Sequence, residues 1–376
     1  MSRSFDAASG LPMGSEARRA MDAALEHGWA DPARLYRDGR VARQLLDAAR
    51  ASVAAAIGAL PQEVSFTSSG TEALHDGVLG LARGRRKVGA KVVAGAVEHS
   101  AVLRAADWVM SGKDPILVPV DSHGEVEVKA FRRAVRSPGV ALAAVQHVNH
   151  EVGTVQPLAE LHENAAEAGV PLLVDAAASL GALPAPTHWD VLAGSAHKWG
   201  GPPGIGILAI RPGVRWRSPS PTDESRRRAG FPNVPGAVAA ATALEQATAT
   251  LGRTGPHRRR LLTILRERVP QLAPDVLALG SPEGAPHIVC FTILYADGEV
   301  LVSELDRAGY EVSSGSACTS DTRRPSHVLA AMGAVTHGNL RVSLPPDATE
   351  ADIAGFLSAL PAAITAARAA ADGPSR

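Results

Sequence analysis

Cysteines, aromatic residues and net charge are all scarce in this sequence. Of its 376 residues, two are Cys, 4% are Phe, Trp or Tyr, and 38 Lys and Arg balance 38 Asp and Glu. Two thiols, those of Cys290 and Cys318, cannot form a disulfide framework or a four-thiolate zinc site, and we expect no metal. A net charge of zero gives no overall attraction to nucleic acid or to an anionic membrane.

Long apolar runs are also missing. Residues 1–6 contain no apolar run of the kind that a secretory signal needs, and no stretch of eighteen apolar residues lacks a charge or a breaker. We therefore expect a cytoplasmic, thiol-reduced protein that does not bind nucleic acid or membranes directly. What is present is 45% hydrophobic residues, too many for a disordered chain, in a length that suits one large domain or two ordinary ones.

Short β-branched runs alternate with longer segments rich in Ala, Leu and Arg through the first part of the chain. Helices are expected between the runs, including one over 44–58 and one over 158–168. The predicted strands cover residues 63–67, 91–94, 116–120, 141–145 and 171–175. This alternation predicts an α/β fold with a mostly parallel sheet between layers of helices. The strands lack a strict apolar–polar alternation, which indicates burial on both faces.

The pattern changes near residue 250. Later strands are fewer, at 287–294, 310–312 and 340–343, and a helix is expected over 298–308. We therefore divide the chain into a large domain, 15–250, and a smaller α+β domain made of 1–14 and 251–376.

The segment Ala193–Gly206 holds a lysine that folding alone explains poorly. Ser195, His197 and Lys198 lie within four residues and are followed by backbone-permissive glycines. A solvated loop is the ordinary place for a lysine. A lysine can also form a Schiff base with a carbonyl cofactor, of which pyridoxal phosphate is the commonest.

Such a cofactor makes demands that two other strand ends meet. Its pyridine nitrogen needs an acidic partner, and Asp175 ends the strand 171–175, where α/β sheets bind ligands. A helix cap is the alternative role for this aspartate. A flat group should cover the ring, and His99 follows the strand at 91–94. A structural role is the more usual one for a lone histidine.

A phosphate needs backbone amides at the start of a helix. Gly70 and Thr71 follow the predicted strand 63–67 and open a helical pattern. Glycine allows close approach, and a helix N-terminus favours an anion. The same pattern is also that of an ordinary helix cap.

The two cysteines stand in contrasting surroundings. Cys318 lies in a small, polar, glycine-containing stretch, 313–321, which makes it a candidate nucleophile. Cys290 lies in an apolar strand pattern and is predicted to be buried and inert. Arg341, on a short predicted strand, could hold a carboxylate through two hydrogen bonds, although a surface ion pair is the commoner role.

In this order along the chain, these segments resemble the cysteine desulfurases, pyridoxal-phosphate enzymes of the class V aminotransferase group with fold type I. The resemblance spans nearly the whole chain, from Phe5 to Arg341, and its last stretch looks like the sulfur-accepting loop of the family. The motifs that carry it are Ser195–Lys198, Gly70–Glu72, Glu98-His99, His147–Gly153, Val174–Ala176 and Ser313–Ser320. The resemblance implies a seven-stranded sheet and a homodimer with active sites at the subunit interface.

The resemblance also implies a role for each motif residue. Lys198 would hold the cofactor and move protons, Asp175 would pair with the ring nitrogen, and His99 would stack on the ring. The phosphate would be bound by Gly70, Thr71, Ser195 and His197. The carboxylate of L-cysteine would be held by Asn149 and Arg341. Cys318 would take the sulfur as a persulfide, with release of alanine, for transfer to a protein acceptor.

The chain departs from the family pattern near the cofactor. Ala178 stands where the family has a Gln or His that bonds the phenolic oxygen, and Phe231 stands where it has a threonine that reaches the partner's phosphate. Losing two neutral hydrogen bonds, at roughly 0.5–1.5 kcal/mol each, would weaken cofactor binding by about one or two decades. We expect a divergent member of the family.

Three functions remain open at this point. The first is a cysteine desulfurase, whose acceptor could serve iron–sulfur assembly, tRNA thiolation, phosphorothioate DNA or a thio-cofactor. The second is another class V enzyme, such as a C–S lyase, a selenocysteine lyase or an aminotransferase, in which Cys318 is incidental. The third is a non-catalytic scaffold. The stretch around Cys318 favours the first, and the joint presence of Lys198, Asp175 and His99 disfavours the third.

Overall fold

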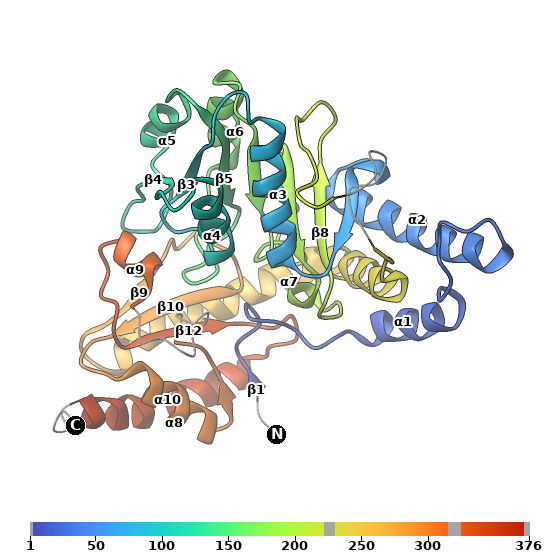
Figure 1. Ribbon diagram of the computed structural model, residues 1–376. Helices are drawn as coiled ribbons and strands as arrows, with labels where there is room; N and C mark the ends of the chain where they lie inside the picture. The colour runs from blue at the N-terminus through green and yellow to red at the C-terminus, as the bar shows by residue number, and fades with distance from the viewer. Residues whose placement is uncertain (1–2, 222–229, 315–324, 372–376) are drawn as a thin grey trace.

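The computed structural model describes residues 3–221, 230–314 and 325–371, and its largest unit is a seven-stranded sheet (Figure 1). The strand order is β2-β8-β7-β6-β5-β3-β4. The strands are β2 (Val64–Thr67), β3 (Lys91–Gly95), β4 (Ile116–Val118), β5 (Val140–Gln146), β6 (Leu172–Asp175), β7 (Val191–Ser195) and β8 (Gly206–Ile210). β8 runs antiparallel to both of its neighbours and the other pairs are parallel. The predicted mostly parallel sheet is confirmed.

Helices cover both faces of this sheet, because successive side chains of a strand point to opposite sides. In β6, Leu172 and Val174 belong to one buried cluster and Leu173 belongs to another. The cluster around Leu173 lies under α3 (Gly70–Gly84) and α4 (Ser100–Val109). The opposite cluster lies under α2 (Arg37–Ile57), α5 (Val128–Val135), α6 (Leu158–Glu167) and α7 (Val234–Leu272), with α1 (Ser15–His27) packed on α7. Burial on both faces explains why these strands lack alternation.

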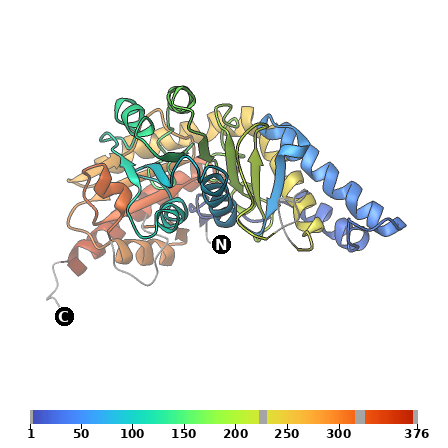
Figure 2. The same cartoon turned by 45° about the horizontal axis from the view of Figure 1, so that its top comes forward.

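A smaller unit lies at the other end of the molecule from α2 (Figure 2). Its antiparallel sheet has the order β9-β10-β12, and a parallel pair, β1-β11, lies beside it. Its elements are β1 (Arg3–Ser4), β9 (Val276–Leu279), β10 (Ile288–Ile293), α8 (Gly298–Arg307), β11 (Tyr310–Glu311), β12 (Asn339–Ser343) and α10 (Glu350–Ala371). The buried core of this unit contains Phe5, Phe291 and Phe356. The short helix α9 (His327–Ala331) lies between β11 and β12 in the chain, but its Val328 and Leu329 are buried in the core of the large unit.

The passage between the two units occurs inside α7. The first half of α7 contributes Val234 and Leu244 to the core of the large unit, and the second half contributes Leu261 and Leu265 to the small one. The boundary predicted at residue 250 therefore falls within one continuous helix, and the division into domains stays a prediction.

One helix of the described ranges, α10, is long and apolar enough to cross a membrane by length and composition. Its Phe356, Leu360 and Ile364 are buried in the core of the small unit. The apolar character of α10 is thus accounted for by packing within the protein.

Most predicted elements lie within a few residues of the observed ones. The sequence pattern did not reveal β1, β9, β7 and β8, and the last two of these flank the glycine-rich segment with Lys198. Both are fully buried and short, and the glycines between them mask their pattern. Gly169, predicted to end a helix, follows α6 with a φ of +64°.

Candidate active site

A cavity of about 580 Å³ lies at the carboxyl ends of β3, β6 and β7, next to β12 of the small unit. It gathers eight of the predicted site residues: Gly70, Thr71, His99, Asp175, Ser195, His197, Lys198 and Arg341. The first and the last of them in the sequence, Gly70 and Arg341, are 271 positions apart. The cavity is therefore the place where the motifs of the sequence meet.

Lys198 is placed by a short turn that follows β7. The strand ends at Ser195 and continues as a 3₁₀ turn over Ala196–Trp199, which Gly200 ends with a φ of +82°. Trp199 is buried and its indole N–H donates to the carbonyl of Ala240 in α7, at 3.1 Å. This anchor fixes the turn, so that Lys198 lines the cavity while Trp199 packs into the core.

Asp175 and His99 occupy the ends of two strands of the same sheet edge. Asp175 is the last residue of β6, is 7% exposed, and accepts a hydrogen bond from the amide of Ala177 at 2.8 Å. His99 caps α4, and its Nδ1 accepts from the amide of Ala101 at 3.1 Å. The neutral His99 ring therefore carries its proton on Nε2.

Burial sets the charge of the histidine at this edge. Burial lowers the pKa of His99, the positive charge of Lys198 lowers it further, and only Asp175 opposes the change. The ring thus favours the neutral form, which suits a flat group that packs against a cofactor.

The start of α3 forms a cradle for an anion. Ser69 caps the helix by accepting from the amide of Glu72, while the first amides, including those of Gly70 and Thr71, have no acceptor within the helix. A Cβ on Gly70 would lie 2.6 Å from the Cβ of Ser195, so only glycine allows this approach of α3 to β7. The cradle fits a phosphate at a helix N-terminus.

Two side chains complete the cradle. The Oγ of Ser195 lies 3.1 Å from Nδ1 of His197. Burial lowers the pKa of His197, and Lys198 lowers it further. Together with Lys198 and Asp175, these donors fit pyridoxal phosphate. Ala178 lines the same cavity and offers no polar side chain there, so the departure seen in the sequence is a real loss of a hydrogen-bonding group.

Arg341 faces the cavity from β12 and is 3% exposed. One of its terminal nitrogens donates to Asp6 Oδ1 at 2.6 Å and to Ser9 Oγ at 2.7 Å, and the other donates to the carbonyl of His150 at 3.0 Å. The residue is thus neither a surface arginine nor a free one. It is buried, oriented by the N-terminal segment and aimed at the cavity.

Asn149, predicted beside Arg341, has a different environment. It is fully buried, its amide donates to the carbonyl of Val97, and its Oδ1 accepts from the amides of Glu151 and Val152. These bonds fix a tight turn after β5 and place the neighbouring His150 and Glu151 in the cavity lining. A direct role for Asn149 toward the substrate carboxylate stays a prediction.

Three further polar residues line the cavity, and the sequence pattern had predicted no role for them: His150, Glu151 and Ser326. The Ser326 hydroxyl donates to the Glu151 carboxylate at 2.6 Å, and the other oxygen of Glu151 lies 3.7 Å from His150 Nε2. Burial raises the pKa of Glu151 to about 7. The only signal in the sequence was the motif His147–Gly153, which contains two of the three.

A second histidine ring stands against His99. The rings of His99 and His150 meet edge to face, with centroids 5.1 Å apart. Burial lowers the pKa of His150 well below its usual value, and His99 and Lys198 add to this effect. Both imidazoles therefore favour the neutral state, and neither adds a positive charge to the side of the cavity that Arg341 serves.

The structure describes one of the two cysteines. Cys290 lies on β10 opposite Arg341, is fully buried, and has a pKa raised to about 12, chiefly by burial. The prediction that it is a packing residue is confirmed. Cys318 lies outside the described residues.

The sheet order and the lysine-centred cavity define the class, an α/β enzyme of the fold that serves pyridoxal-phosphate chemistry. The class V aminotransferase profile matches residues 15–356. An IscS-like cysteine desulfurase of Mycobacterium tuberculosis is 37% identical over 98% of this chain and 97% of its own length, and a cysteine desulfurase IscS of Methanosarcina thermophila is 33% identical over 95% and 90%. The chain belongs to the cysteine desulfurase family of the class V aminotransferases.

Solved structures agree with this assignment. A NifS-like protein superimposes with a TM-score of 0.89 at 28% identity, covering 97% of this chain and all of the other. A cysteine desulfurase from Thermococcus onnurineus superimposes with a TM-score of 0.85 at 25% identity, over 97% and 95% of the two chains. The predicted fold type I is confirmed by these likenesses.

Proposed function

We propose that the protein is a cysteine desulfurase that binds pyridoxal phosphate, converts L-cysteine to alanine and keeps the sulfur as a persulfide on Cys318. One observation carries this proposal. A single cavity holds the amine of Lys198, the carboxylate of Asp175, the imidazole of His99 and the guanidinium of Arg341. The amine, the carboxylate and the imidazole suit an aldehyde cofactor, and the guanidinium suits the carboxylate of an amino-acid substrate.

Each residue has a task that its surroundings support. Asp175 would pair with the pyridine nitrogen of the cofactor, and the neutral ring of His99 would cover its face. The cradle at Gly70, Thr71, Ser195 and His197 would hold the phosphate. Lys198 Nζ would hold the cofactor and then carry protons at the substrate Cα. When bound, the cofactor supplies an electron sink for the electron pairs released at the substrate carbons.

The sulfur step is balanced between the substrate and one thiol. The Cys318 thiolate attacks the substrate sulfur, an S–S bond forms, and the Cβ–S bond breaks. Its electron pair stays with the substrate carbon, which takes up a proton and leaves as alanine. The role of Cys318 rests on its sequence context, since a small polar stretch favours a reactive thiolate.

The direct test is to incubate the cofactor-loaded protein with L-cysteine, quantify alanine, and look for a mass gain of one sulfur on the peptide that contains Cys318. Cys318→Ser should retain the cofactor absorbance and form no persulfide, and Cys290→Ser is the matched control. Formation of pyruvate and free sulfide, unaffected by Cys318→Ser, would contradict the proposal and indicate a lyase.

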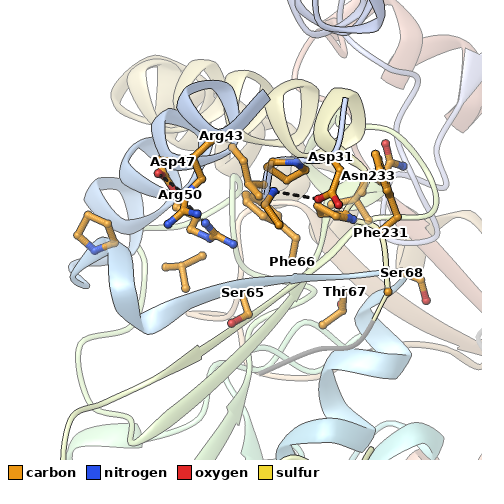
Figure 3. Close-up of a pocket in the computed structure, with 18 of the residues that line it drawn as sticks. Asp31, Arg43, Asp47, Arg50, Ser65, Phe66, Thr67, Ser68, Phe231 and Asn233 are labelled. Carbon is orange, nitrogen blue, oxygen red and sulfur yellow. Dashed lines mark hydrogen bonds and ion pairs between the residues drawn. The ribbon is translucent and has the colours of Figure 1, made fainter. Parts of the chain in front are cut away.

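We also propose a homodimer, with a second copy seated in a groove beside the cavity. The groove has a volume of about 950 Å³ and runs along the edge strand β2, between α2 and residues 230–233 (Figure 3). Thr67 and Ser68 line the groove, and Gly70 and Thr71 of the phosphate cradle follow closely in the chain and line the cavity. Phe231, 64% exposed, stands at the rim. A second copy here would cover an apolar side chain and an open sheet edge.

The oligomeric state is tested by light scattering during size-exclusion chromatography. The wild type should elute as a dimer, and Phe231→Asp should shift the population toward monomer and weaken cofactor binding. A monomeric wild type would contradict this part of the proposal. The protein that accepts the sulfur and the cytoplasmic location stay predictions.

A further inference from the structure

The guanidinium of Arg341 already carries a carboxylate in this structure. Asp6 Oδ1 and Ser9 Oγ take both hydrogens of one terminal nitrogen, at 2.6 and 2.7 Å. The carbonyl of His150 takes one hydrogen of the other terminal nitrogen. The buried Nε has no hydrogen-bond partner among the described residues.

This pattern leaves no complete fork for a second carboxylate. A guanidinium binds a carboxylate bidentately through either of two forks, and both forks use the same terminal nitrogen. In Arg341 that nitrogen is the one that donates to Asp6 and Ser9. Without any rearrangement, a substrate carboxylate can therefore accept only isolated hydrogen bonds from Arg341. It can bind bidentately only if it displaces Asp6 or Ser9.

Asp6 is held at this place by the backbone on either side of it. Ser343, two residues beyond Arg341, donates its amide to the carbonyl of Phe5, and its Oγ accepts from the amide of Ala8. Further along, the amide of Leu11 donates to the carbonyl of His197, next to Lys198. The N-terminal segment thus connects β12 to the lysine turn. Its Ala8 and Ser9, which follow Asp6 closely in the chain, line the cavity.

The two partners of the ion pair differ in exposure. The side chain of Arg341 is 4% exposed and that of Asp6 is 26% exposed. An arginine this deeply buried is costly without a counter-ion, so a carboxylate is needed whenever the substrate is absent. Asp6, by contrast, can turn toward water when it is displaced, and two carboxylates on one guanidinium would repel each other.

We propose that Asp6 is a stand-in for the substrate carboxylate, which neutralises Arg341 in the empty site and competes with L-cysteine for its fork. Asp6 is thus a specificity-determining residue. Its charge stabilises the empty site, and its competition for Arg341 raises the concentration of carboxylate ligand that is needed to fill the site. The inference rests on the proposed function, in which Arg341 holds the carboxylate of L-cysteine.

The test is Asp6→Asn in the cofactor-loaded enzyme. Asparagine keeps an oxygen that accepts from Arg341 but removes the competing charge. KM for L-cysteine should fall by roughly three- to tenfold, the scale of one partly exposed charge pair, and kcat should stay within about twofold. Inhibition by cysteamine, which has the amine and thiol of the substrate but no carboxylate, should not change.

Three variants control for other causes. Asp6→Glu keeps the charge, so its KM should stay near that of the wild type. Ser9→Ala removes a neutral partner of Arg341 and should change KM by less than about twofold. Asp347→Asn breaks an exposed ion pair of the same N-terminal segment with Arg3 and should have no effect on KM.

The outcomes separate this inference from the proposed function. An unchanged or raised KM in Asp6→Asn, with cysteamine inhibition unaltered, overturns the stand-in and leaves Asp6 as a support for Arg341. An equal fall of KM in Ser9→Ala also overturns it, because charge is then not the cause. If Arg341→Ala leaves KM unchanged, the substrate carboxylate binds elsewhere. The proposed role of Arg341 then fails, and the inference about Asp6 fails together with it.

Discussion

The two ends of the cavity are built in different ways. At the end that we assign to the cofactor, Asp175 is the last residue of a strand, and His99 and Lys198 each come soon after a strand of the same sheet. Their positions are therefore fixed by the order β7-β6-β5-β3. At the substrate end, Arg341 comes from the small sheet and Asp6 from the N-terminal segment, 335 residues away. The first end is a property of one sheet, and the second exists only when two units and the N-terminal segment meet.

This difference predicts that damage at one end should leave the other intact. Residues of the cofactor end should control whether the cofactor binds, whereas residues of the substrate end should control KM with the cofactor in place.

Lys198→Ala should abolish the absorbance of bound cofactor and lower alanine formation by about a thousandfold or more, because Lys198 is the only lysine among the described residues that line the cavity. A visible spectrum and an alanine assay measure the two effects. Lys129→Ala, an exposed lysine of α5, is the matched control. A variant that keeps both the spectrum and the rate would remove Lys198 from the centre of the site.

Arg341→Ala should keep the cofactor spectrum and raise KM for L-cysteine by about 10- to 150-fold, the value of one or two charge-assisted hydrogen bonds. It should also destabilise the protein, because Asp6 then loses its partner. Steady-state kinetics and a urea titration measure these effects. Loss of the cofactor from this variant would break the proposed separation of the two ends.

Glu151→Gln tests the electrostatics of the substrate end. Burial raises the pKa of Glu151 from 4.5 to about 7, so the folded protein binds this proton more tightly than the unfolded chain. The contribution of Glu151 to stability is complete below about pH 4.5 and is lost as the pH rises through about 7. Glutamine stays neutral and can still accept from Ser326.

The Glu151→Gln variant should therefore be more stable than the wild type by about 1–2 kcal/mol at pH 8, which is less than the full energy that corresponds to the pKa change. The difference in stability should vanish near pH 4.5. Denaturant unfolding at both pH values measures it, with Glu163→Gln, on an exposed site of α6, as the control for one lost negative charge. A difference that does not depend on pH would contradict this account of Glu151.

Cys290→Ala should have the smallest effect. Removing the sulfur from a fully buried position leaves a small void that costs roughly 1–2 kcal/mol of stability. Alanine and persulfide formation should stay unchanged. In the wild type, an alkylating reagent should modify Cys290 only after unfolding, because its pKa is raised to about 12. Modification of native Cys290, followed by mass spectrometry, would contradict its assignment as a packing residue.

Local patterns were enough to select the residues that meet at the sheet side of the cavity. A buried strand followed by Asp175, a glycine at the start of a helix and a lysine between glycines are each visible within ten residues. Parallel strands then bring these strand ends to one edge of the sheet. The strands β7 and β8 were missed because glycines interrupt their apolar pattern, although Lys198, which lies between them, was found.

Local patterns could not predict the partners of the substrate end. Nothing near Asp6 in the sequence indicates that it binds Arg341, and nothing near Ser326 indicates that it donates to Glu151. Asn149 is the opposite case, because the motif predicted that it faces the substrate. In the structure its side chain makes its hydrogen bonds within a buried turn and to the carbonyl of Val97. Each of these contacts depends on how distant segments pack, which no short pattern encodes.

Residue types and their spacing were sufficient to assign the class of fold, to select the candidate site residues and to distinguish a buried Cys290 from a Cys318 in a polar stretch. These follow from residue type and spacing, because strand periodicity and glycine positions act over a few residues. The burial of the Arg341 guanidinium and its ion pair with Asp6, in contrast, became visible only in the folded chain. Burial and pairing depend on segments hundreds of residues apart, and it is their packing that sets how each charge behaves.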